Sequence, residues 1–339
     1  MKVLVTGSTG FLGSHIVRRL HADDHDLRLL ARTPAKVAPL MERMGVDPAA
    51  LDVVEGDITD AASVESAVAG CDGVVHAAAV VATDPTRDAA MEATNLEGAT
   101  NVLGAAVAAG CDPIVHVSSV SALFPFRTDP VTADHPVVGE GNAYARTKAA
   151  CDRLARDHQA AGKPVVILYP SGIIGPDDWT ESINLASAVL WLERGMPKAK
   201  GMSGSYVDVR DLAEIVAASM APGRGPARLL AMGTHLTSAE HAEAIGQALG
   251  VPAKTMPAPR PVMWAWGWLG TLARRFGRDI VLTRDGYDYL FHSKPGDDSA
   301  TVAATGVEFR PVVDTFRDTF RWMHEAGHVD AKHVGTLAG

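Results

Sequence analysis

A tyrosine and a lysine four residues apart have the types and the spacing needed for proton transfer to or from a substrate oxygen. They lie in the stretch Tyr144-Ala145-Arg146-Thr147-Lys148. On a helix this spacing puts both side chains on one face, one turn apart. A phenol ionises only at about pH 10, but a neighbouring ammonium stabilises the phenolate. We therefore predict that Tyr144 exchanges a proton with a carbonyl or alcohol oxygen while Lys148 supports it.

A serine before this pair can complete the site. Ser119 ends a strand-like run, 25 residues before Tyr144. Its hydroxyl would donate a hydrogen bond to the same substrate oxygen, where negative charge develops. The adjacent Ser118 is an alternative. A Tyr-x-x-x-Lys spacing is common by itself, so its interpretation depends on what accompanies it in the chain.

A glycine-rich loop near the start of the sequence accompanies it. The strand-like run Lys2–Thr6 leads into Gly7-Ser8-Thr9-Gly10-Phe11-Leu12-Gly13, and a helical pattern follows. Glycines let the backbone approach a pyrophosphate closely, and the N–H groups and dipole of a helix N-terminus attract its negative charge. The loop therefore predicts a nicotinamide dinucleotide, whose hydride would arrive as Tyr144 protonates the oxygen. Lys148 would also hold the ribose hydroxyls of this cofactor.

The end of the second predicted strand indicates which dinucleotide binds. NAD enzymes place an acid about 20 residues after the glycines, where it holds the ribose 2′-hydroxyl. The stretch here is Leu29-Leu30-Ala31-Arg32-Thr33, which has no acid, and Arg32 lies 19 residues after Gly13. A guanidinium there can pair with the 2′-phosphate of NADP, with Lys36 as a second cation. We predict NADP(H) and keep NAD(H) as the alternative.

An aspartate that follows the third predicted strand has two interpretations. In the stretch Gly56-Asp57-Ile58, Asp57 would lie beside the adenine amino group. A helix N-cap at Asp57 or at Asp60 is equally favoured by the residues alone.

Short β-branched runs alternate with helical patterns through the first half of the chain. The predicted strands are Lys2–Thr6, Asp26–Ala31, Leu51–Glu55, Gly73–His76, Ile114–Ser118 and Val165–Tyr169. The predicted helices are Phe11–His21, Ala61–Ala69, Met91–Ala109 and Asn142–Ala161. This alternation is typical of βαβ units with right-handed crossovers, and hence of a parallel sheet. We predict an α/β fold, a Rossmann doubly wound parallel sheet with a smaller C-terminal substrate-binding region.

The regular alternation stops after Pro170. Turn-rich stretches such as GPDD and APGRGPAR interrupt the helical patterns there. We predict a dinucleotide-binding Rossmann domain over residues 1–170 and a mainly substrate-binding region over residues 171–330. A late strand-like run, Arg228–Met232, is expected to return to the Rossmann sheet.

Composition and charge restrict the class of protein. With 47% hydrophobic and 21% charged residues, the 339-residue chain is predicted to fold throughout. Its net charge of −9 opposes binding to nucleic acid, whose phosphates it would repel. The odd, widely spaced cysteines, Cys71, Cys111 and Cys151, indicate a reducing compartment, and the first residues do not resemble a secretion signal. We expect a cytoplasmic protein.

An apolar, tryptophan-rich segment lies late in the chain. Pro261–Ala273 is nearly uncharged and is followed by Arg274, Arg275 and Arg278. A membrane span needs about 20 apolar residues, and this segment is much shorter. We predict a buried helix or one that covers a substrate pocket, with weak contact with a membrane interface as the alternative.

A zinc-protease pattern near the end of the chain is not predicted to bind metal. His324-Glu325-Ala326-Gly327-His328 fits the spacing of two histidines on one helix face. The preceding residues Phe316–Met323 form an amphipathic helical pattern, and Gly327 is predicted to end that helix. The turn at Gly327 would carry His328 off the face. We therefore expect no metal site.

Seven motifs in order resemble those of the extended short-chain dehydrogenase/reductase family, and most closely its dihydroflavonol-4-reductase-like members. They are TGSTGFLG, VVHAAAV, TNLEGATNV, VHVSS, YARTK, LYPSGIIGP and YVDVRDLA. The resemblance implies that Asn95 supports the catalytic group formed by Ser119, Tyr144 and Lys148. It also implies cofactor contacts at Gly7, Thr9, Gly10, Phe11, Leu12, Gly13, Ile58, Ala77, Ala78, Ala79, Tyr169, Pro170, Ser171 and Ile173. In this family, helices such as Met91–Ala109 and Asn142–Ala161 commonly form a homodimer.

Two departures from the family concern the substrate. Phe124 stands where plant dihydroflavonol reductases place a substrate-holding Asn, which argues against a flavonoid. The stretch SALFPF replaces the Tyr-Gly pair that sugar-nucleotide epimerases usually have after the serine. Apolar side chains that are candidates for lining a substrate pocket are Leu123, Phe124, Phe126, Trp264, Trp266 and Trp268.

The predicted function is hydride transfer between NADP(H) and a ketone, an aldehyde or a secondary alcohol on a mainly apolar small molecule. One alternative is a sugar-nucleotide epimerase or dehydratase that retains NAD(H), and another is a 3β-hydroxysteroid-type dehydrogenase that uses NAD. Arg32 argues against both. A non-catalytic NADP-sensing regulator is a minor alternative, and the intact pair of Tyr144 and Lys148 argues against it.

Overall fold

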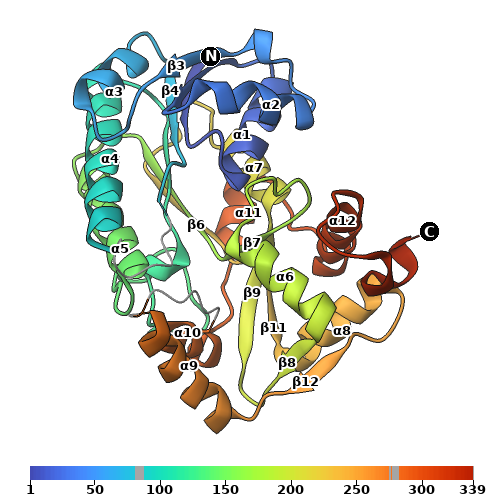
Figure 1. The fold of residues 1–339 in the computed structure, drawn as a ribbon. Helices are drawn as coiled ribbons and strands as arrows, with labels where there is room; N and C mark the ends of the chain where they lie inside the picture. Colours follow the sequence, from blue (N-terminus) through green and yellow to red (C-terminus); the bar gives the residue numbers. More distant parts are fainter. Residues whose placement is uncertain (81–87, 275, 277–281, 339) are drawn as a thin grey trace.

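The core of the protein is a seven-stranded parallel sheet (Figure 1), seen in a computed structural model that describes residues 1–80, 88–274, 276 and 282–338. The strand order is β10-β6-β5-β4-β1-β2-β3, and every neighbouring pair is parallel. The strands are β1 (Lys2–Thr6), β2 (Asp26–Ala31), β3 (Asp52–Glu55), β4 (Gly73–His76), β5 (Ile114–Val117), β6 (Val165–Pro170) and β10 (Ala227–Ala231). The order reverses between β1 and β4, and ligands of such sheets bind at that switch point. The predicted Rossmann doubly wound fold is confirmed.

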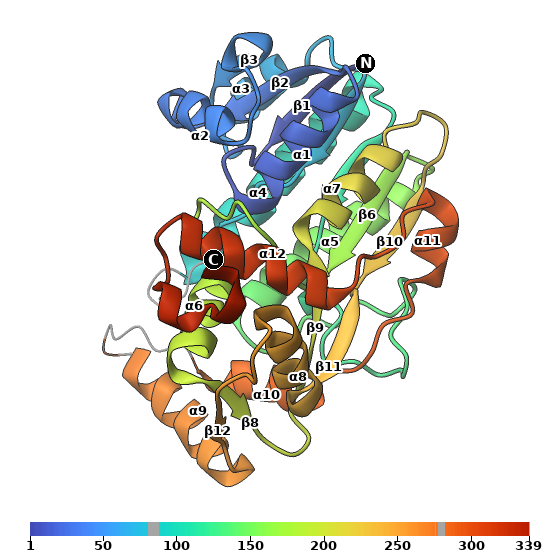
Figure 2. The same cartoon turned by 90° about the vertical axis from the view of Figure 1, so that its right-hand side faces the viewer.

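Helices cover both faces of this sheet. On one face lie α1 (Phe11–Ala22), α2 (Val37–Arg43) and α7 (Val209–Ala218), and Figure 2 shows α1 and α7 side by side. On the other face lie α3 (Ala61–Val68), α4 (Asp88–Ala109) and α5 (Ala143–Ala160). Because side chains alternate along a strand, Val3 and Val5 pack toward α1 and α7 whereas Leu4 packs toward the opposite helices. All three are fully buried, as expected for a sheet covered on both sides.

A smaller region is built at the carboxyl ends of the strands. Its three-stranded sheet has the order β11-β9-β7, and its two-stranded sheet pairs β12 with β8. The strands are β7 (Gly172–Ile174), β8 (Met196–Lys198), β9 (Ser203–Asp208), β11 (Thr234–Thr237) and β12 (Thr255–Pro257). The helices of the second half are α6 (Ile183–Arg194), α8 (Ser238–Leu249), α9 (Arg260–Arg274), α10 (Arg284–His292), α11 (Ser299–Thr305) and α12 (Val312–Glu325). Since β7 follows β6 and β11 follows β10 after short connections, the smaller region lies where the main strands end.

The predicted elements agree with the structure to within three residues at each end. All six predicted strands and all four predicted helices are present, and the largest difference is that α4 begins at Asp88 instead of Met91. The late strand-like run forms β10, which pairs with β6 in the main sheet. A functional division at residue 170 stays a prediction, because in space the second half of the chain contributes to both regions.

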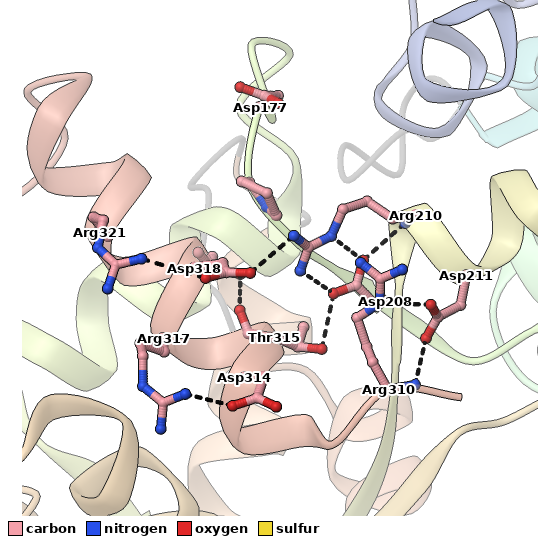
Figure 3. A network of polar contacts seen from close by, with 12 residues as sticks. Asp177, Asp208, Arg210, Asp211, Arg310, Asp314, Thr315, Arg317, Asp318 and Arg321 are labelled. Atoms are coloured by element: carbon pink, nitrogen blue, oxygen red, sulfur yellow. Dashed lines mark hydrogen bonds and ion pairs between the residues drawn. The ribbon is translucent and has the colours of Figure 1, made fainter. Parts of the chain in front are cut away.

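A buried ionic network fixes the last helix of the smaller region to the Rossmann domain (Figure 3). Asp208 caps α7 by accepting from the backbone N–H of Arg210 at 2.8 Å, and the Arg210 guanidinium binds both of its carboxylate oxygens at 2.9 and 2.7 Å. The Thr315 hydroxyl donates to Asp208 at 2.8 Å, and Arg210 also reaches Asp318 at 2.8 Å. Burial by itself would raise the pKa of Asp208, but Arg210 and Arg310 outweigh it and hold that pKa below its ordinary value. The VDVRD motif therefore joins α7 to α12.

The zinc-protease pattern lies at the end of α12, as predicted. The helix ends at Glu325, and Gly327 follows in the left-handed region with φ +82°. The two histidines have separate local contacts, since His324 Nδ1 lies 3.1 Å from the Val329 carbonyl and the His328 ring packs against Trp322. Within the described ranges, no three His, Cys, Asp or Glu side chains are grouped as metal ligands would be.

The tryptophan-rich segment forms α9. Of the two predicted alternatives, a buried helix is wrong, whereas Met263 and Trp266 of this helix do line a cavity. Its buried residues are Gly267 and Gly270, and its tryptophans are exposed. Arg275 and Arg278 lie outside the described residues. None of the helices in the described ranges combines the length and the apolar composition needed to cross a bilayer.

Candidate active site

The glycine-rich loop brings the N-terminus of α1 against the ends of two strands. Gly7 has φ +78°, and a Cβ on it would lie 2.6 Å from the backbone nitrogen of Ala78. A Cβ on Gly13 would lie 1.9 Å from the Gly7 carbonyl oxygen, and the Gly10 N–H donates to that same oxygen at 2.9 Å. Side chains at Gly7 and Gly13 would therefore push the helix away from β1 and β4, whereas glycines leave its first N–H groups at the switch point.

This loop fits a dinucleotide. Gly10 is the N-cap of α1 and offers no side-chain oxygen to the first turn, so the helix N-terminus has free donors for an anion. The Ser8 hydroxyl is buried and has no hydrogen-bond partner among the described residues. A pyrophosphate would supply acceptors to both. Thr9 is half-buried in the same loop, and Phe11 and Leu12 are buried beneath it in the first turn of α1.

The segment after β4 lies across the switch point from this loop. Ala77, Ala78 and Ala79 are half-buried, and Ala78 is the neighbour that a side chain at Gly7 would strike. Asn95 on α4 holds the next residue, Val80, with both atoms of its amide: Oδ1 accepts from the Val80 N–H at 2.7 Å and Nδ2 donates to the Val80 carbonyl at 2.9 Å. The Asn95 side chain therefore positions the segment by its backbone, and among the described residues its amide forms hydrogen bonds to Val80 and none to Tyr144 or Lys148.

Tyr144 and Lys148 occupy the first turns of α5. Asn142 caps this helix by accepting from the Ala145 N–H at 2.9 Å. The Lys148 Nζ lies 6.0 Å from the centroid of the Tyr144 ring, so the two side chains share a helix face as the spacing predicts. The Nζ also donates to the Val117 carbonyl at 3.0 Å, which ties the buried lysine to the end of β5. The pair therefore stands at the edge of the sheet where the glycine-rich loop opens.

The two serines after β5 differ in their partners. The Ser118 hydroxyl is buried and donates to Asp152 Oδ2 on α5 at 2.9 Å. The Ser119 hydroxyl accepts from the Ser121 N–H at 3.1 Å, and its own proton has no acceptor among the residues that the structure describes. This geometry favours Ser119 over Ser118 as a donor to a substrate oxygen.

The second predicted cofactor contact lies directly after β2. Arg32 and Lys36 are exposed, and neither forms an ion pair with a residue that the structure describes. The Asp57 carboxylate accepts from the Thr59 N–H and hydroxyl, both at 3.0 Å, while the N-cap of α3 is Asp60. Ile58 packs on α4, where a Cβ at Gly98 would lie 2.3 Å from its Cδ1. Of the two interpretations of Asp57, the N-cap is excluded and the adenine contact stays a prediction.

The residues at the end of β6 mostly face the protein. The Tyr169 ring is fully buried, and its hydroxyl donates to Asp152 at 3.2 Å and accepts from Arg156 at 3.0 Å. Burial and Asp152 raise the pKa of Tyr169 above its ordinary value, so the phenol stays neutral. The Ser171 hydroxyl donates to the Met232 carbonyl at 2.8 Å, beside Pro170. These side chains support the sheet edge, and Ile173, half-buried on β7, lies next along the chain.

The family of the chain follows from its sequence as well as its geometry. The model of the NAD dependent epimerase/dehydratase family matches residues 3–228. The chain belongs to this family. Enzymes of this extended short-chain dehydrogenase/reductase type are oxidoreductases with a nicotinamide dinucleotide, which the glycine-rich loop fits.

Curated relatives match between about two thirds and nearly all of the chain. The sterol demethylase protein B of Methylococcus capsulatus is 27% identical over 336 residues, which cover 97% of this chain and 100% of that protein. Cinnamoyl-CoA reductase 1 of Oryza sativa is 32% identical over 259 residues, covering 70% and 73%. A crystal structure of the dTDP-glucose 4,6-dehydratase of Streptomyces venezuelae with NAD bound has a TM-score of 0.72 and 25% identity, covering 98% of this chain and 100% of that one.

A large cavity lies beside the catalytic pair and was not located by the sequence. Its volume is about 1010 Å³, and Asn142 and Ala145, which flank Tyr144, form part of its wall. Large apolar and aromatic side chains form about half of the remaining wall, among them Phe124, Met196, Met202, Tyr206, Leu236, Met263, Trp266 and Tyr289. Of the predicted lining residues, Phe124 and Trp266 reach the cavity. Leu123 and Phe126 are instead buried in the core, and Trp264 and Trp268 are exposed outside the cavity wall. The remaining wall comes from short elements far apart in the chain, for which the sequence has no motif.

The ionisable groups of this cavity differ from those that a diphosphate requires. Its walls carry three carboxylates, Glu140, Asp285 and Asp288, and among the described lining residues Arg284 is the one lysine or arginine. That guanidinium lies 4.6 Å from the Trp268 ring centroid. His241 is enclosed by Trp191, Tyr206 and Phe316, and burial lowers its pKa to about 3. The imidazole is therefore neutral at pH 7, and the cavity as a whole is apolar and weakly acidic.

Proposed function

We propose that this chain is an NADP(H)-dependent reductase or dehydrogenase that transfers hydride between nicotinamide and a carbonyl carbon, or the matching secondary alcohol, on a mainly apolar small molecule. The observation that carries the proposal is the cavity beside Tyr144. A nucleotide sugar would bring a diphosphate to a wall with three carboxylates and one guanidinium. An uncharged apolar ketone or aldehyde avoids that repulsion and buries its surface against the Phe, Met, Leu and Trp side chains.

NADP(H) is the favoured cofactor because of the groups after β2. Arg32 is exposed and forms no ion pair with a described residue, so its guanidinium is available to the 2′-phosphate. The stretch has no acid that would hold the 2′-hydroxyl of NAD. NAD(H) is the alternative that the tests below distinguish.

Each residue of the site has its own role in the proposed hydride transfer. When bound, the cofactor supplies or accepts the hydride. In the reductive direction the Tyr144 hydroxyl donates its proton to the carbonyl oxygen, and the Ser119 hydroxyl donates a hydrogen bond to the same oxygen. Lys148, fixed on the Val117 carbonyl, keeps a positive charge beside the phenolate that remains. Asn95 fixes the backbone opposite the glycine-rich loop.

The decisive experiment identifies the nucleotide and then follows its fate. The purified protein is denatured and any released nucleotide identified, and NADPH absorbance is followed with panels of apolar ketones and aldehydes and with nucleotide sugars. We expect stoichiometric NADPH loss with an apolar carbonyl. Tightly retained NAD(H), with conversion of a nucleotide sugar and no net NADPH loss, would identify an epimerase or dehydratase instead. NADPH binding without turnover of any class would favour a regulator.

We propose two further properties of the chain, its oligomeric state and its location in the cell. The resemblance to the family favours a homodimer through α4 and α5, and sedimentation velocity measures it. A cytoplasmic location stays a prediction from the widely spaced cysteines, which localisation of a tagged chain would check.

A further inference from the structure

Helix α9 presents large apolar side chains to solvent. Trp264 is 54% exposed, Trp266 65%, Leu269 62% and Leu272 52%. A surface helix of a soluble protein normally has its apolar stripe toward the core and polar residues outside. The exposed stripe of α9 therefore calls for a partner outside the described chain.

The side of α9 that faces the protein carries glycines. Gly267 and Gly270 are the buried residues of the helix, and a Cβ on Gly267 would lie 3.2 Å from the Thr283 carbonyl oxygen and 3.3 Å from the Arg284 Cα. The helix thus approaches the start of α10 closely at Gly267. Packing within the protein accounts for Trp266, which lines the cavity, and for Trp268, which lies under the Arg284 guanidinium, whereas Trp264, Leu269 and Leu272 remain more than half exposed.

The charge around α9 indicates the chemistry of the partner. The described residues between 254 and 288 include four lysines and arginines, Lys254, Arg260, Arg274 and Arg284, and two aspartates, Asp285 and Asp288, a net charge of +2, whereas the whole chain carries −9. Arg260 and Arg274 stand at the two ends of α9, and Arg284 lies over the Trp268 ring. A second copy docked on this face would bring like charges together. An anionic surface would attract them.

Tryptophan and leucine on one face of a helix with arginines at its ends are the composition of helices that lie in a bilayer interface. We propose that α9 docks this protein on the surface of bilayers that contain anionic phospholipids, with Trp264, Leu269 and Leu272 in the boundary between headgroups and acyl chains. Figure 1 shows α9 and α10 at the end of the molecule opposite α2 and α3, where a flat surface can reach them.

The docking face is continuous with the substrate cavity. Met263 and Trp266 of α9 belong to the cavity wall together with Leu282 and Tyr289. Docking would therefore place the cavity against the apolar phase, from which an apolar substrate can enter. Entry of an apolar substrate from the bilayer rests on the proposed function, whereas docking of α9 on the bilayer does not.

The test is cosedimentation of the full chain with vesicles of phosphatidylcholine, and with vesicles of equal parts phosphatidylcholine and phosphatidylglycerol. We expect binding to the anionic vesicles that weakens as salt is raised, and a blue shift of tryptophan fluorescence. The double variant Leu269→Ser with Leu272→Ser should bind the anionic vesicles at least about tenfold more weakly, because it lacks the two leucine side chains that move from water into the bilayer on binding. Neither leucine lines the cavity. Vesicle binding is therefore measured without substrate and separately from enzymatic activity.

The control is Val251→Ser, which removes an exposed apolar side chain, 42% exposed, outside α9. It should leave vesicle binding unchanged. Trp264→Ser replaces the double variant if the latter does not keep the wild-type unfolding temperature. The proposal is overturned if the wild-type chain does not sediment with anionic vesicles, or if Val251→Ser loses as much binding as the double variant. It is also overturned if light scattering shows a dimer that the double variant dissociates and no vesicle binding is seen.

Discussion

The Ser118 hydroxyl donates a hydrogen bond of 2.9 Å to Asp152, whereas the proton of the adjacent Ser119 hydroxyl has no acceptor among the described residues. Ser119→Ala should therefore lower kcat by about 10²- to 10³-fold, the usual loss for one donor to a developing oxyanion. Ser118→Ala should keep most activity and lower the free energy of unfolding by about 1–3 kcal/mol, because the buried Asp152 loses a partner. Steady-state kinetics and urea unfolding of both variants measure this. The opposite pattern would make Ser118 the catalytic serine.

Tyr144→Phe should lower turnover by about 10²- to 10⁴-fold, since the hydroxyl is the proton donor while the ring supplies the packing. Cofactor affinity and thermal stability should change little. The control is Tyr289→Phe, because Tyr289 lines the same cavity and burial, together with the Tyr144 phenol, raises its pKa to about 12. Turnover of Tyr144→Phe above about a tenth of the wild-type rate would contradict the assignment.

Arg32→Ala should weaken NADPH binding by about 10- to 100-fold, the value of one charge-assisted pair to a phosphate. NADH affinity should stay the same, because NADH has no 2′-phosphate. Isothermal titration of both cofactors into both proteins separates these effects, with the exposed Arg153 on α5 as a matched control for loss of a cation. Equal affinities of the wild-type chain for NADPH and NADH would remove the NADP assignment.

Gly13→Ala should weaken cofactor binding by at least about tenfold, because its Cβ would meet the Gly7 carbonyl oxygen and force the loop open. Gly104→Ala is the control in another helix, α4. A Cβ there meets no atom within 4 Å, so it should bind the cofactor normally and gain about 0.5–1 kcal/mol in stability. Fluorescence titration with NADPH distinguishes the two variants. Wild-type affinity in Gly13→Ala would show that α1 does not need this close approach.

Asp208→Asn should lower the free energy of unfolding by about 3 kcal/mol at pH 7, since Arg210 loses its buried counterion. The pKa of Asp208 is held below its ordinary value, so the stability from its charge is present above about pH 4 and is lost as the pH falls through the lowered pKa. The gap between wild type and variant in urea unfolding should therefore close only below about pH 4. Asp314→Asn, whose half-exposed carboxylate pairs with Arg317, should cost less than about 1 kcal/mol at any pH. A gap that is constant down to pH 3 would mean that the charge of Asp208 does not matter.

The sequence predicts the parts of the site that depend on local spacing. Tyr144 and Lys148 share a helix face because four residues make about one turn, and the glycine-rich loop depends on three glycines in one stretch. The cavity wall could not be predicted, because Met196, Leu236 and Tyr289 meet only through tertiary packing. For Tyr169, the resemblance to the family implied a cofactor contact, whereas the buried hydrogen bonds to Asp152 and Arg156 turn its side chain into the protein.

The exposed face of α9 is a further feature that the sequence did not predict. An apolar run is usually a buried helix, and composition alone cannot show which side of it meets the protein. The buried glycines carried that information, and at Gly267 the missing side chain allows close approach to the start of α10.

The pairing of β10 with β6 has a consequence for dissecting this enzyme. Gln159 on α5 donates to the carbonyls of Val165 and Ala227 at 2.8 Å each, and Thr301 on α11 donates to Leu230 at 2.6 Å. A fragment cut after residue 170 would keep the glycine-rich loop and the catalytic pair but leave β6 as a bare edge strand, whose open N–H and C=O groups promote aggregation. A chimera that exchanges substrate specificity between relatives must therefore leave β10 and α11 with the parent sheet and graft only the segments around them.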